Sequence, residues 1–148
     1  MISKKLYGIA ENKGIEIHSR NMGGFVKSQS QPAPSGAHYV AVDYSRISTR
    51  AEENVVLAHE IGHCLTGAFY SRYTHPVIRA RQEMRANKAA LNMALPLNAL
   101  MCAIDYGCNN RYEFSEYLGL TEDFVQKALD YYADDLRAAW LRRSELYY

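Results

Sequence analysis

The chain has 148 residues, 48% of them apolar, and a formal net charge of +1. This length and composition predict one folded domain over residues 1–148, and we expect it to be cytoplasmic because its first residues lack a signal-peptide pattern and no run approaches the roughly 18 apolar residues of a membrane span. The nearly balanced charge gives no general attraction to nucleic acid or to a membrane, so we expect neither as a direct partner.

Residues 1–48 have the pattern of a mixed α+β segment. Residues 4–13 favour a short helix, and residues 15–18 alternate apolar and polar side chains as a half-buried strand does. The glycine pair at 23–24 predicts a turn, after which residues 25–26 could pair back as a second short strand.

A polar segment comes next in the chain, and an apolar segment follows it. Residues 27–36 are polar and contain Pro32 and Pro34, which predicts a loop or mobile flap. Residues 38–44 form an apolar run with β-branched and aromatic side chains, which predicts a strand. This strand precedes the helix described next, so it could be the sheet edge that receives an extended peptide, or simply an ordinary strand.

Residues 51–66 predict a core helix. Ser48 or Thr49 can cap its beginning, and Glu52 and Glu53 suit the positive end of the helix dipole. Apolar side chains cover most of its faces, so histidines on this helix are expected to be at least partly buried.

That helix carries His59-Glu60-Ile61-Gly62-His63, the His-Glu-x-x-His pattern. Residues four apart lie on one helix face, so His59 and His63 can bind one metal ion while Glu60 takes a proton from a metal-bound water. A chain of this composition is expected to contain about 0.01 accidental matches to this pattern. The alternative is a surface helix with two solvated histidines. Gly62 is costly inside a helix, which indicates close approach of another backbone or plain helix packing.

The third metal ligand has to come from another segment, and Glu83 is the candidate. Residues 79–93 predict a second helix, on which Glu83 shares a face with Ala86, Asn87, Ala90 and Ala94. Small side chains there would let the two helices pack closely and direct Glu83 to the metal. Two histidines and one carboxylate leave a coordination position open, as in catalytic zinc sites. An exposed helix glutamate is the alternative.

Three motifs together resemble the ImmA/IrrE family of metallo-endopeptidases. They are His59-Glu-Ile-Gly-His63, Glu83-Met-Arg-Ala86-Asn87-Lys-Ala-Ala90, and Leu95-Pro96. The resemblance covers about residues 50–97. It implies a gluzincin-like site with His59, His63 and Glu83 on one Zn²⁺ ion and Glu60 as the general base. It also implies that the substrate is a separate protein, a repressor of a phage, mobile element or stress regulon, cut at a specific site.

The loop between the two metal helices is rich in aromatic residues. Zinc peptidases commonly need a donor for the oxygen that becomes negative during peptide cleavage. Tyr73 or His75 could supply it, although loop aromatic residues more often only pack.

The remaining residues predict a helical C-terminal part. A helix begins at residues 97–102, another covers 112–118 and ends at Gly119, and Thr121 caps the last. Inward-facing residues at helical spacing along that last helix are Phe124, Ala128, Leu129, Tyr132, Leu136 and Trp140.

The outline of helix, glycine turn and helix is also that of a helix-turn-helix DNA-binding motif. Its acidic residues oppose DNA binding: Glu113, Glu116, Glu122 and Asp123. The three cysteines show no metal or disulfide spacing, so we expect Cys102 and Cys108 to fill the core.

These patterns predict an α+β fold: a small N-terminal mixed or antiparallel sheet over residues 1–48, packed on a zincin-type helix within 49–97, and an all-helical part over 98–148. Two functions follow. The first is a zinc-dependent site-specific endopeptidase, in which metal-bound water attacks the peptide with Glu60 as base. The second is a catalytically latent binding or toxin–antitoxin partner with the same metal-binding fold.

Overall fold

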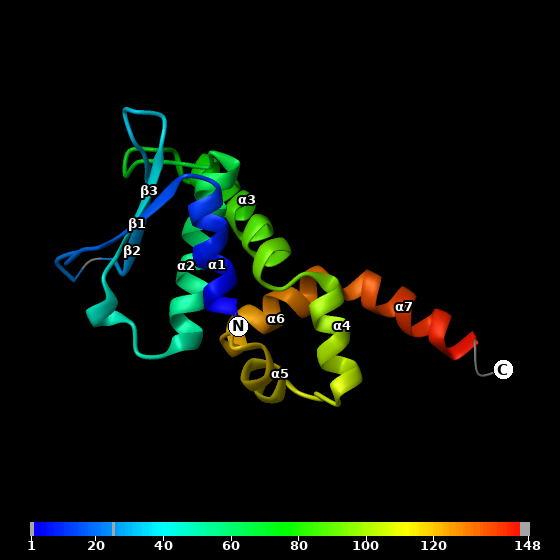
Figure 1. Ribbon diagram of the computed structural model, residues 1–148. Helices are drawn as coiled ribbons and strands as arrows, with labels where there is room; N and C mark the ends of the chain where they lie inside the picture. The colour runs from blue at the N-terminus through cyan, green and yellow to red at the C-terminus, as the bar shows by residue number, and fades with distance from the viewer. Residues whose placement is uncertain (1, 25, 146–148) are drawn as a thin grey trace.

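A mixed sheet lies on one side of the central helices, and a group of shorter helices lies on the other (Figure 1). The computed structural model describes residues 2–24 and 26–145. Over these residues the chain forms seven α-helices and three strands: α1 (Ile2–Asn12), β1 (Ile15–Ser19), β2 (Ser28–Pro32), β3 (His38–Val42), α2 (Arg50–Thr66), α3 (Pro76–Ala94), α4 (Leu97–Tyr106), α5 (Arg111–Leu118), α6 (Glu122–Tyr131) and α7 (Ala133–Glu145). The predicted α+β class and mixed sheet are confirmed.

The sheet has the order β1-β3-β2, with β1 parallel and β2 antiparallel to β3. The edge position predicted for residues 38–44 is therefore wrong, because β3 is the central strand. Its residues Val40, Ala41 and Val42 are all buried, as expected for a strand with a neighbour on each side.

Strand β2 lies where the sequence predicts a loop or flap. Its residues are polar, so it lacks the apolar alternation by which strands are recognised, and backbone pairing with β3 holds it in place. Pro32 is tolerated because it stands at the end of an edge strand. The turn at Gly23 and Gly24 is confirmed. Of the strand predicted at 25–26, residue 25 lies outside the described residues, and Val26 is not in a strand.

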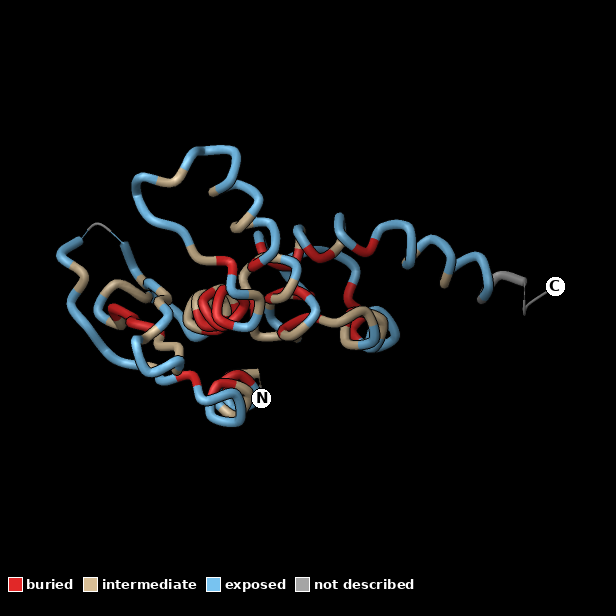
Figure 2. The backbone as a smooth tube through the Cα atoms, turned by 90° about the horizontal axis from the view of Figure 1, so that it is seen from above, coloured by how far each residue is buried: buried red, intermediate tan, exposed pale blue. Residues whose placement is uncertain are grey.

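The core forms where α1, β3, α2 and the later helices meet. Its largest fully buried side chains include Leu6, Val40, Leu57, Ile61 and Leu100. Figure 2 shows the buried backbone gathered in the central helices, with α2 seen nearly end-on. The metal motif predicted on α2 thus stands on a helix fixed from several sides.

The last predicted helix is interrupted. It breaks at Tyr132 into α6 and α7, although no proline or glycine marks the break. The Tyr132 side chain is buried, and its hydroxyl donates to Asn92 Oδ1 at 3.3 Å, while α7 projects away from the body (Figures 1 and 2). The inward orientation predicted for Trp140 is wrong, because this side chain is 68% exposed.

Two further predictions are tested by burial and helix length. Cys108 is buried as predicted, whereas Cys102 is exposed, so only the former fills the core; all three cysteines are free. Among the described residues no single helix has the length and apolar character to cross a membrane, and only α3 and α4 taken together, across a 50° bend, would pass that test.

Candidate metal centre

Helix α2 is capped at both ends, which fixes where its histidines lie. Thr49, not Ser48, is the N-cap, and its side-chain oxygen accepts the backbone N–H of Glu52 at 3.1 Å. Gly67 ends the helix in the left-handed conformation, with φ of 64°. This reversal brings the backbone of Ala68 against the ring of His63.

The three predicted metal ligands come together. The Nε2 atoms of His59 and His63 are 3.1 Å apart, and each lies 3.2 Å from an oxygen of Glu83. Their ligand atoms all lie within 4.8 Å of one another, so the group could hold a metal ion. His63 is buried, whereas His59 and Glu83 are partly exposed and leave the group accessible from solvent.

Hydrogen bonds to the other ring nitrogens fix which histidine atoms face this group. His63 Nδ1 is 2.6 Å from the carbonyl oxygen of Ala68, which can only accept, so Nδ1 donates. His59 Nδ1 is 3.0 Å from Asn87 Oδ1 and donates in the same way. In the neutral rings, both Nε2 lone pairs then point at each other and at a carboxylate. The two ring nitrogens and the carboxylate then have no proton between them and repel one another, so the arrangement fits a bound cation.

Close contact between α2 and α3 makes this convergence possible. A Cβ added to Gly62 would lie 2.5 Å from the backbone oxygen of Ala86 and 3.4 Å from the nitrogen of Ala90. The close backbone approach predicted at Gly62 is thus confirmed, as are the small residues on the facing side of α3. Helix α3 begins three residues earlier than predicted, with Pro76 at its first turn.

Glu60 lines a cavity of about 240 Å³ together with one of the three ligands, His63. Its side chain is only 6% exposed, and its Oε1 accepts a hydrogen bond of 2.6 Å from the hydroxyl of Ser28 on β2. The cavity is also lined by His63, Phe69 and Tyr70. A buried carboxylate that faces a cavity next to a metal group is placed to exchange protons with a molecule in that cavity.

Tyr70, which the sequence reasoning did not select, is the aromatic residue of the loop that reaches the site. Its hydroxyl donates to Glu83 Oε1, and its ring lies 6.0 Å from that of His63. Burial, together with the bond to Glu83, raises the pKa of Tyr70 to about 12, so the hydroxyl keeps its proton near neutral pH.

The two donors proposed from the sequence are engaged elsewhere. Tyr73 is 81% exposed and accepts a hydrogen bond from Arg72, while His75 caps α3 through its bond from the N–H of Val77. Neither lines the cavity, so the structure does not support either as the oxyanion donor. Sequence offers no signal that separates Tyr70 from Tyr73, because both stand in one loop.

Comparison of the chain with known protein families, with curated proteins and with solved structures finds no match.

Proposed function

We propose that this chain is a zinc-dependent endopeptidase that cuts a regulatory protein at a specific site. The observation that carries the proposal is the buried carboxylate of Glu60, which lines an accessible cavity together with His63 of the His59, His63 and Glu83 group. Two histidines and one carboxylate form a ligand set typical of catalytic zinc, with one position left for water or substrate.

When bound, a zinc ion supplies two effects at such a site: it lowers the pKa of a water molecule to about 7, and it polarises a carbonyl group. The protein residues do the rest. Glu60 takes the proton from the attacking water and passes it to the leaving amine. Ser28 holds one oxygen of Glu60 in place, and we assign the proton exchange to the other oxygen.

Tyr70 is the residue that we assign to the carbonyl oxygen as it gains negative charge. Its hydroxyl keeps its proton near neutral pH, and its ring lines the same cavity as Glu60 and His63. In other hydrolases, removal of a donor in this role lowers the rate about 10²–10³-fold.

We assign substrate binding to strand β2 instead of residues 38–44, which the sequence predicted for this role. It is an edge strand, and Ser28, Gln29 and Ser30 all line the cavity. Successive side chains point to opposite faces, so a cavity lined by three consecutive residues runs along the strand edge. An extended peptide paired with that edge would lie over Glu60. The family resemblance adds the substrate class, a repressor of a phage, mobile element or stress regulon.

The test combines metal content with cleavage. Purified protein is analysed for zinc and then incubated with a candidate repressor, and the products are identified by mass spectrometry. Glu60→Gln should keep the zinc and abolish cleavage, whereas Glu122→Gln, which makes the same change at an exposed position of α6, should leave both unchanged. Cleavage by the Glu60 variant would refute the assigned base. Zinc binding without cleavage of any tested protein would favour the latent binding partner instead.

A further inference from the structure

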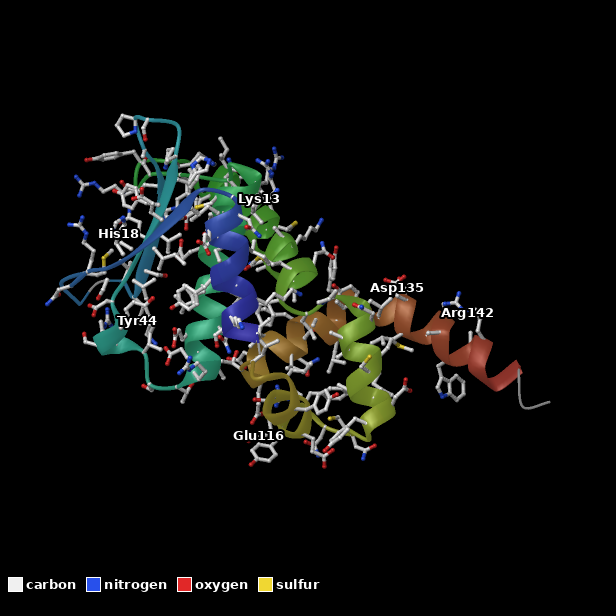
Figure 3. All side chains as sticks on the ribbon, in the orientation of Figure 1. Lys13, His18, Tyr44, Glu116, Asp135 and Arg142 are labelled. Atoms are coloured by element: carbon white, nitrogen blue, oxygen red, sulfur yellow. The ribbon has the colours of Figure 1, made fainter. Side chains whose placement is uncertain are left out.

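A second pocket, of about 400 Å³, lies at the corner between α4 and α5. We call it the tyrosine–glutamate pocket, and its side chains are those of Tyr106, Cys108, Tyr112, Glu113, Glu116 and Tyr117. Figure 3 places Glu116 on α5, at the bottom of the molecule in that view. Helix α5 is joined to α2 through Asn54, whose side chain donates to the carbonyl of Gly119 at 2.8 Å. The pocket therefore lies toward the beginning of α2, and the histidines lie toward its end.

The tyrosines of this pocket expose large aromatic surfaces. Tyr106 is 75% and Tyr112 62% exposed, and the rings of Tyr106 and Tyr117 stand 4.5 Å apart at an angle of 35°. Solvated single aromatic side chains are common, but a cluster of them around a concave surface is typical of a binding site.

The charge of the pocket is negative. Glu113 and Glu116 both line it, and no lysine or arginine is among its described lining residues. One oxygen of Glu113 accepts the backbone N–H of Asn109 at 2.7 Å, which holds this carboxylate at the pocket. Burial raises the pKa of the Cys108 thiol, and the charge of Glu113 raises it further. A neutral apolar ligand would not use these carboxylates, and a nucleic acid would be repelled by them.

We propose that the tyrosine–glutamate pocket binds an arginine side chain from a basic, extended segment of a protein partner. A guanidinium group stacks on tyrosine rings through its plane and donates to carboxylates through its N–H groups, so one side chain uses both features of the pocket. A lysine ammonium group, which has no plane to stack, uses mainly the carboxylates. This binding needs neither the metal group nor any cleavage, so it stands or fails independently of the proposed protease.

The test is a titration of the ¹⁵N-labelled 148-residue chain with a short peptide of alternating arginine and glycine. The control peptide carries citrulline, which has the shape of arginine without its charge. The arginine peptide should shift the amide signals of Gly107, Cys108 and Tyr117, and the citrulline peptide should bind about tenfold more weakly or not at all. Absence of these shifts at about 1 mM arginine peptide, or equal binding of both peptides, would overturn the proposal.

Variants then assign the binding to this pocket. Tyr106→Ala and Glu116→Gln should each weaken binding about two- to fivefold, and the double variant about tenfold. Tyr73→Ala and Glu122→Gln make the same changes at exposed positions outside the pocket and should leave the affinity unchanged. Unaltered signals away from the substituted residue show that each variant is folded. Equal weakening by the controls would show that the peptide binds through general charge attraction, which contradicts the proposed site.

Discussion

Substitution of Gly62 by alanine tests the contact that brings the metal ligands together. The added Cβ would lie 2.5 Å from the backbone oxygen of Ala86, whereas ordinary contact begins at 3.4 Å. The neighbour is backbone on a helix, so it cannot rotate away as a flexible side chain would. Helices α2 and α3 therefore have to separate by about 0.9 Å at this point.

The expected change in the free energy of unfolding follows from two opposing effects. Alanine is favoured over glycine in a helix interior by about 1 kcal/mol. Overpacking of this kind costs about 1–3 kcal/mol, so the free energy of unfolding should fall by up to about 2 kcal/mol. The shift also moves Glu83 relative to His59 and His63, and metal sites tolerate only about 0.2 Å in ligand distance. We expect zinc affinity to fall at least about tenfold.

Gly8→Ala is the matched control. Gly8 also lies within a helix, α1, and a Cβ there would meet nothing within 4 Å. The free energy of unfolding of this variant should rise by up to about 1 kcal/mol, and its zinc affinity should stay the same. Denaturant unfolding of the zinc-free proteins and zinc competition with a chelator measure the two quantities. If Gly62→Ala were stabilised like Gly8→Ala and bound zinc normally, the close packing of α2 on α3 would not be what positions the ligands.

Three other substitutions separate metal binding, catalysis and folding. Asn87→Ala removes the acceptor of His59 Nδ1 and should weaken zinc binding about 10–100-fold in the chelator assay; an unchanged affinity would show that this bond does not orient the ring. Tyr70→Phe should lower the cleavage rate about 10²–10³-fold while zinc affinity changes far less, and a loss confined to zinc affinity would mean that Tyr70 only positions Glu83. Thr49→Ala removes the α2 cap and should cost about 1 kcal/mol in denaturant unfolding, and an unchanged midpoint would contradict the cap.

The helices that carry the metal group could be predicted from the sequence because their determinants are local. Spacing of four residues places His59 and His63 on one face, and the capping and small residues of α2 and α3 lie within the segments that they shape. Gly62 also indicates a close contact, since a helix gains nothing from glycine except space.

The features that could not be predicted depend on contacts between distant segments. The polar strand β2 is held by its pairing with β3, and β3 becomes central only because β2 pairs with it. Ser28 reaches Glu60 only through that pairing. The choice of Tyr70 over Tyr73 depends on the path of a loop, and the break between α6 and α7 falls at the buried Tyr132, where no proline or glycine marks it.

The most direct test of the central claim is a crystal structure of the zinc-loaded protein with anomalous diffraction at the zinc absorption edge. The account predicts one anomalous peak about 2.0–2.2 Å from His59 Nε2, from His63 Nε2 and from a carboxylate oxygen of Glu83. Zinc held elsewhere, for instance by the sulfur of a cysteine at about 2.3 Å, or a protein that binds no zinc while fully folded, would contradict it.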